Sequence, residues 1–130
     1  MNEVYNYLKE CGVYYLGTTD KDQPKLRPFG TIDLYEGKLY IQTGKIKNVS
    51  KQMKSNPKIE ICAMNKGTWI RLTAKAYLDE SVEAQKHMLD QYPSLQKQYQ
   101  PGDGNNEVFY LQEVTAVINA FGEEPKVYNF

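Results

Sequence analysis

The sequence predicts a mainly β protein with small helices, folded as a six-stranded antiparallel barrel. Apolar residues alternate with polar ones in several stretches, which is the period of strands with one buried face. Short turn-forming clusters separate these stretches, and two or three brief segments have helical spacing instead. The 130 residues show no internal repeat or linker, so residues 1–130 are expected to be one domain. Closing the sheet would remove the exposed edges of six apolar strands.

The first half of the chain is expected to hold one helix and three strands. Val4 and Leu8 are four residues apart and predict an amphipathic helix over residues 2–10, which Gly12 ends. β-Branched and aromatic residues then form extended runs, and Glu36-Gly37 reads as a hairpin turn. The strands expected here are 13–19, 25–35 and 39–43.

The second half is expected to hold two helices and three strands. An apolar stripe at helical spacing predicts a helix that stops before Pro57, and another predicts a helix that Asp79 or Ser81 caps and Pro93 ends. The stripes are Ile46, Val49 and Met53, and then Ala84, Met88 and Tyr92. The strands expected are 59–63, 69–78 and 107–121, followed by a tail from 122 to 130.

Composition and charge narrow the class of protein. Sixteen basic and sixteen acidic residues leave no net charge, which argues against binding to nucleic acid or to an anionic membrane. No apolar run is long enough to span a bilayer, and no signal peptide is recognisable. Cys11 and Cys62 lack the spacing of a redox pair or a zinc site, so we interpret them as reduced thiols. A cytoplasmic location is expected.

One short segment concentrates positive charge. Five lysines and no acidic residue lie between positions 45 and 58: Lys45, Lys47, Lys51, Lys54 and Lys58. Lys45 and Lys47 fall at the start of the expected helix, where the helix dipole disfavours cations. Together with the Thr43 hydroxyl and free backbone amides, they are typical of a phosphate site. The alternative is a solvated, lysine-rich helix.

Two strands carry further candidate binding residues. Lys25, Arg27 and Phe29 share one face of their strand and offer charge beside an aromatic ring. The alternative is an exposed strand face with one core phenylalanine. Trp69 and Arg71 likewise share one face of their strand, where they could form a patch that stacks on a ring or contacts a partner. The alternative is that Trp69 only packs within the protein.

The order of several motifs resembles the pyridoxamine 5'-phosphate oxidase-like FMN-binding split-barrel superfamily. The resemblance covers nearly the whole chain, is strongest from 25 to 78, and continues through Trp69 and its strand. Its motifs are Lys25-Leu-Arg-Pro-Phe29, Leu39-Tyr-Ile-Gln-Thr43, Lys47-Asn48, Gln52-Met53 and Ser55-Asn-Pro-Lys-Ile-Glu-Ile61.

This resemblance implies a six-stranded split barrel that dimerises and holds two FMN molecules between its subunits. The family's Arg on the second strand, Thr ending the third and polar residues opening the next helix hold the flavin phosphate and ring. Those roles fall on Arg27, Thr43, Lys47 and Asn48, with Lys45 beside them. Pro28, Phe29 and the Val49 backbone would lie beside the ring or phosphate, and Trp69 would reach the flavin or the partner subunit.

Two departures argue against vitamin B6 oxidation. Oxidases of that kind begin the helix with Ser-Arg-Lys and have an extended C-terminal region, whereas this helix begins Lys45-Ile-Lys-Asn48 and the tail is short. The short form is more similar to the general-stress and nitroimidazole-resistance relatives. The latter have an active-site His near the flavin, for which this chain shows no counterpart; its one histidine, His87, is expected to be an exposed helix residue.

The leading hypothesis is therefore an FMN-dependent oxidoreductase that passes electrons from a reduced nicotinamide or another donor to a small organic acceptor. No residue is identified as its acid or base. A second hypothesis is a protein that binds flavin, haem or a deazaflavin without turnover. Nucleic-acid binding through the lysine-rich helix is a third, and the neutral total charge argues against it.

Overall fold

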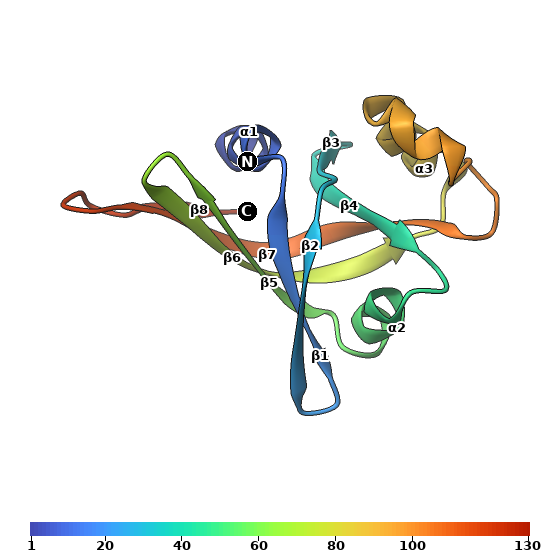
Figure 1. Ribbon diagram of the computed structural model, residues 1–130, viewed down its shortest axis with the longest axis horizontal. Helices are drawn as coiled ribbons and strands as arrows, with labels where there is room; N and C mark the ends of the chain where they lie inside the picture. The colour runs from blue at the N-terminus through green and yellow to red at the C-terminus, as the bar shows by residue number, and fades with distance from the viewer.

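The computed structural model describes residues 1–130 as one antiparallel eight-stranded sheet with three α-helices and one 3-10 helix around it (Figure 1). None of the helices combines the length and apolarity needed to cross a membrane. The elements in chain order are α1 (Asn2–Cys11), β1 (Tyr14–Asp20), β2 (Gln23–Phe29), β3 (Asp33–Tyr35), β4 (Lys38–Gly44), α2 (Asn48–Ser55), β5 (Lys58–Asn65), β6 (Thr68–Asp79), α3 (Val82–Gln91), η1 (Pro93–Lys97), β7 (Asn106–Ala120) and β8 (Lys126–Asn129).

The strands pair in the order β2-β1-β5-β6-β7-β4-β3, and β8 adds to β7. The long strands β6 and β7 form the middle of this path, and the sheet is strongly twisted (Figure 1). The two ends of the path, β2 and β3, are consecutive in the chain and joined by residues 30–32. No hydrogen-bonded ladder joins β2 to β3, so strand pairing does not close the sheet into a complete barrel.

The structure has eight strands where the sequence predicted six. The expected strand 25–35 is broken because residues 31 and 32 bond to side chains instead of a neighbouring strand. The Thr31 carbonyl accepts the Tyr14 hydroxyl at 2.6 Å, and the Ile32 N–H donates to the Tyr92 hydroxyl at 2.9 Å. The tail also forms a strand, since β8 pairs with residues 115–118.

Alternation along the strands places the main core as predicted. On β6, Ile70 and Leu72 are buried while Arg71 is exposed. Helices α1 and α2 cover this core from two sides and contribute the buried side chains of Leu8 and Met53. Helix α2 begins only at Asn48, so the expectation that Ile46 belongs to its apolar stripe was wrong; Ile46 precedes the helix and is 77% exposed.

Helix α3 packs over a second, smaller cluster. The Ser81 hydroxyl accepts from the Ala84 N–H at 3.2 Å and caps the helix, which settles the choice between Asp79 and Ser81. Ala84 and Met88 pack there against Tyr40 of β4 and Val108 of β7. This cluster fixes α3, and η1 after it, beside the end of β4.

Candidate functional site

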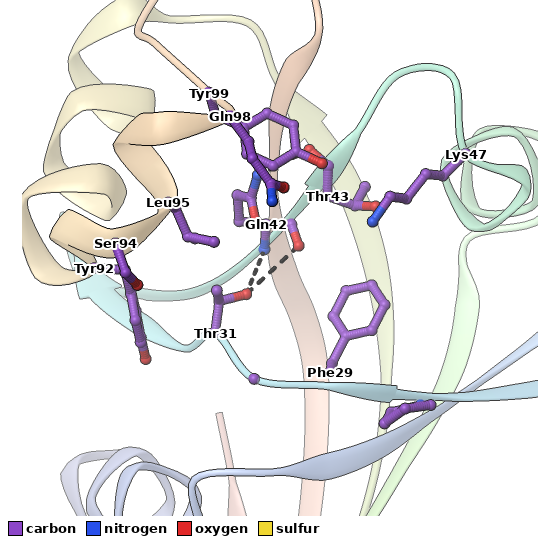
Figure 2. Close-up of a pocket in the computed structure, with 12 residues that line it drawn as sticks. Phe29, Thr31, Gln42, Thr43, Lys47, Tyr92, Ser94, Leu95, Gln98 and Tyr99 are labelled. Atoms are coloured by element: carbon purple, nitrogen blue, oxygen red, sulfur yellow. Dashed lines mark hydrogen bonds between the residues drawn. The ribbon is translucent and has the colours of Figure 1, made fainter.

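A cavity of about 320 Å³ lies where the β2–β3 link, the end of β4, the approach to α2 and the η1 segment meet (Figure 2). Its volume is at the lower end of the range for small-molecule sites. Side chains from segments far apart in the sequence point into it, as Figure 2 shows. The lining residues are Pro28, Phe29, Gly30, Thr31, Gln42, Thr43, Lys47, Tyr92, Ser94, Leu95, Gln98 and Tyr99.

The wall from η1 fits closely against the end of β4. A Cβ atom at Gly44 would lie 2.9 Å from the Tyr99 hydroxyl oxygen and 3.3 Å from its ring carbon Cε1. Only a residue without a side chain therefore leaves the Tyr99 ring where it is. Tyr99 is 7% exposed, and its hydroxyl has no hydrogen-bond partner in the protein. Figure 2 shows this hydroxyl pointing toward Thr43.

The opposite wall is the positively charged start of α2. Lys47 is the N-cap residue, no side chain caps the helix, and the first turn holds no acidic residue. Of the five lysines between positions 45 and 58, only Lys54 has a carboxylate partner, the largely buried Glu107 at 2.7 Å. Figure 2 shows the Lys47 ammonium directed toward Thr43 and Phe29. Free helix amides beside an unpaired ammonium favour binding of an anion.

Arg27 adds a second cation without a carboxylate partner. Its guanidinium turns back over β1 and donates to the Thr18 hydroxyl at 2.7 Å and to Gln52 Oε1 of α2 at 2.8 Å. Thr18 donates to the same Gln52 oxygen at 2.6 Å. Burial lowers the pKa of Arg27 because desolvation disfavours the charged form. The guanidinium is thus held between β2 and α2, outside the cavity lining.

The structure brings four of the nine predicted site residues into the cavity: Pro28, Phe29, Thr43 and Lys47. Lys45 is exposed and lines a neighbouring hollow beside Gly102 and Gly104. Asn48 faces a polar groove of about 600 Å³ on the other side of the α2 start. The Val49 side chain is buried in the main core.

The remaining predicted residue, Trp69, lies at the start of β6, whereas the end of β6 leads toward α3. Its ring packs on Phe121 with the centroids 5.1 Å apart. Within this subunit it is not part of the cavity, so contact between Trp69 and a flavin remains a prediction that involves the partner subunit.

Sequence reasoning missed the whole η1 wall, Gln42 of β4, and Gly30 and Thr31 of the β2–β3 link. Tyr92 was expected at the end of the helix that Pro93 ends, and the residues after Pro93 were expected to be polar and turn-rich. Nothing in the pattern of this segment connects it with β4. Gln42 was the one available signal, because it is an amide in a strand whose other residues are mostly apolar. It is 7% exposed and lines the cavity.

His87 differs from the expectation of an exposed helix residue. Its side chain is 38% exposed, and its Nδ1 lies 2.6 Å from Oδ2 of the buried Asp33. The imidazole also packs on the Tyr35 ring, with the centroids 4.6 Å apart. This pair ties α3 to β3 and does not line the cavity.

The cavity thus combines aromatic walls, unpartnered hydroxyls and a positively charged, uncapped helix start. Phe29 and Tyr99 offer faces for a planar ring, and Lys47 offers charge for a phosphate. These residues fit FMN, which has both parts. The side chains include no obvious nucleophile paired with a base.

Comparison with known proteins gives close and distant structural relatives. A NimC/NimA family protein from Clostridium acetobutylicum is 42% identical with a TM-score of 0.97, over 100% of this chain and 92% of that one. A putative pyridoxamine 5'-phosphate oxidase from Listeria innocua is 16% identical with a TM-score of 0.67, and the match covers 99% of this chain and 96% of that one. HutZ, a haem storage protein from Vibrio cholerae, is 14% identical with a TM-score of 0.66, and the match covers 98% of this chain and 92% of that one. No protein-family model and no curated protein matches the chain.

Proposed function

Because this chain belongs to the NimC/NimA family within the pyridoxamine 5'-phosphate oxidase-like superfamily, we propose that it is an FMN-binding oxidoreductase that acts as a homodimer on a small organic acceptor. The observation that carries the proposal is Lys47, an unpaired cation at an uncapped helix start that also lines an aromatic-walled cavity. The whole chain, 1–130, would be one split-barrel domain in a cytoplasmic protein. The exposed Cys62 thiol suits such a reducing compartment.

The predicted residues that line the cavity each have a task there. Lys47 and the free amides after it would hold the flavin phosphate. Arg27 and Asn48 lie outside the cavity lining and would contact the phosphate only where it extends past the start of α2. Thr43 and Phe29 would contact the ring. The flavin would supply the hydride or electron transfer, and the protein would position the ring and admit the acceptor.

The homodimer is supported by an uncovered apolar surface on the outer face of the sheet. Tyr15, Leu26 and Met64 are 49%, 71% and 74% exposed and lie on the neighbouring strands β1, β2 and β5. Exposed apolar patches of this kind mark interaction sites. We propose that a second copy of the chain covers this face and brings its Trp69, on the adjoining strand β6, toward the partner's flavin.

The cavity favours FMN over haem. A haem protein needs an axial ligand, which is most often His, Cys or Met and less often Tyr; no His, Cys or Met lines the cavity, and of its two tyrosines Tyr92 has its hydroxyl bonded to the Ile32 backbone. The single histidine, His87, lies outside the cavity lining, on α3 beside Asp33. A Soret band after incubation with haemin, without FMN uptake, would contradict the proposed cofactor.

The first test is the visible spectrum of the purified protein after incubation with FMN and gel filtration. We expect one retained FMN per subunit in a dimer-sized peak. Anaerobic bleaching of the bound flavin by a reduced nicotinamide, followed by reoxidation with a small acceptor, would separate an enzyme from a binding protein. A colourless protein after this treatment would overturn the proposal.

A charge reversal tests the phosphate site. Lys47→Glu should weaken FMN binding by about 10- to 100-fold, since one charge-assisted contact contributes about 1.5–3 kcal/mol. Lys58→Glu is the matched control, because Lys58 is another exposed lysine without a carboxylate partner and lines neither the cavity nor the polar groove. Equal affinities of the two variants would remove Lys47 from the site.

A further inference from the structure

Gln42 is held rigidly at the inner end of the cavity. Its backbone N–H donates to the Thr31 hydroxyl at 3.1 Å, and the same hydroxyl donates to its carbonyl at 3.5 Å (Figure 2). Its strand β4 is paired with β7 on the other side. The side chain therefore starts from a backbone that is fixed on both sides.

The orientation of the Gln42 amide follows from its neighbours. Nε2 donates to the Thr43 carbonyl at 3.2 Å and to Asn106 Oδ1 at 2.9 Å. Both amide hydrogens are thus used within the protein. Reversing both amides would give the buried Asn106 Nδ2 a partner, but it would place Gln42 Oε1 against the Thr43 carbonyl oxygen, with two acceptors in contact.

This orientation leaves Gln42 Oε1 as a free acceptor. Asn106 Nδ2 is the one fully buried side-chain polar atom without a partner, so Gln42 Oε1, which also has none, is accessible. Because Gln42 lines the cavity and is otherwise buried, that access is toward the cavity. The hydroxyls of Thr43 and Tyr99 line the same cavity and can donate.

We propose that Gln42 Oε1 accepts a hydrogen bond from a ring N–H of the ligand, so that the cavity selects ligands with an imide edge. In an imide, one N–H lies between two carbonyl oxygens. The N–H would donate to Gln42 Oε1, and the carbonyl oxygens would accept from the Thr43 and Tyr99 hydroxyls. The inference rests on the proposed function, since the pyrimidine edge of the flavin ring, with N3–H between two carbonyls, is such an edge. Gln42 is then a specificity-determining residue.

The first experiment changes the ligand and leaves the protein intact. Dissociation constants of wild-type protein are measured for FMN and for 3-methyl-FMN, in which a methyl group replaces the N3 hydrogen. We expect the analogue to bind at least tenfold more weakly, because a buried acceptor would lose its partner. Equal affinities would overturn the inference. Failure to bind either flavin would overturn the proposed function as well.

The second experiment separates the hydrogen bond from steric exclusion of the methyl group. Gln42→Met keeps the side-chain length and removes the acceptor, so FMN should bind about three- to tenfold more weakly and its preference over 3-methyl-FMN should fall below about threefold. Gln98→Met is the matched control, because Gln98 lines the same cavity and its side chain makes no hydrogen bond in the protein. An unchanged preference in Gln42→Met would show that Gln42 only joins β4 to β7.

A spectroscopic measurement on the wild type covers the case in which Gln42→Met fails to fold. With ¹⁵N-labelled FMN bound, the N3–H proton should be visible by NMR and exchange at least tenfold more slowly than in free FMN. A bound flavin whose N3–H exchanges as in free solution would refute the role of Gln42, whatever the variant does.

Discussion

Substitution of Gly44 tests how closely the η1 wall is fitted to β4. In Gly44→Ala the new methyl would lie 2.9 Å from the Tyr99 hydroxyl and 3.4 Å from Asn105 Oδ1. The first distance is several tenths of an ångström too short, so the Tyr99 ring must move. Such overpacking costs about 1–3 kcal/mol, and the reduced entropy of the unfolded chain offsets about 0.4–1 kcal/mol of it.

The Tyr99 hydroxyl is the atom that the methyl would strike, so the two positions should be coupled. Tyr99→Phe alone should cost less than about 1 kcal/mol, because the hydroxyl has no partner in the protein to lose. The double variant Gly44→Ala/Tyr99→Phe should recover at least about 0.5 kcal/mol relative to the sum of the single changes. Urea unfolding of the four proteins without ligand measures this coupling. Additive effects would refute the assigned contact.

Three further predictions concern the polar contacts around the site. Tyr40→Phe removes the hydroxyl that donates to Asp79 at 2.7 Å. Burial of Asp79 raises its pKa, but hydrogen bonds from Ser81 and Tyr40 outweigh this and lower it below the ordinary value. The stabilisation is therefore present above the unfolded pKa of about 3.9 and is lost as the pH falls through the folded value. Urea titrations should show a loss of about 1 kcal/mol at pH 7 that shrinks below about pH 4; a pH-independent loss would contradict this assignment. Glu107→Gln should lower the free energy of unfolding by about 1–3 kcal/mol in the same assay, because Lys54 loses its only carboxylate partner. A change of less than about 0.5 kcal/mol would show that this ion pair contributes little to stability. His87→Ala leaves the Asp33 carboxylate buried and should cost about 2–4 kcal/mol by thermal or urea unfolding, while adding Asp33→Asn should restore part of it; a further loss would count against the pairing.

Much of the fold could be predicted because apolar and polar residues alternate along most of the strands. The alternation through Ile70 and Leu72 identified β6 and its buried face correctly. The break before β3 could not be predicted, because it depends on hydroxyl groups of Tyr14 and Tyr92 that reach it from other parts of the chain. Strand β8 was missed because its four residues are too few to show a period.

The candidate site was predictable where its residues are local in sequence or belong to the motifs that carry the family resemblance, as Pro28 and Phe29 do. Thr43 and Lys47 stand beside a helix start, and that local pattern indicated an anion site. Gln42 and Tyr99 line the same cavity from segments more than fifty residues apart, and no single window of sequence contains both. His87 likewise gains its partner, Asp33, only through the packing of α3 on β3.

The small cluster beneath α3 has a consequence for how the cavity of this protein can be changed. One wall of the cavity, residues 92–99, rests on this cluster and on a few polar contacts, while the other walls belong to the sheet and to α2. Replacing that wall would change the shape of the cavity without disturbing the main core or the lysine-bearing helix start. Selection or engineering of this chain for a different ligand should therefore concentrate its substitutions in this one short surface segment.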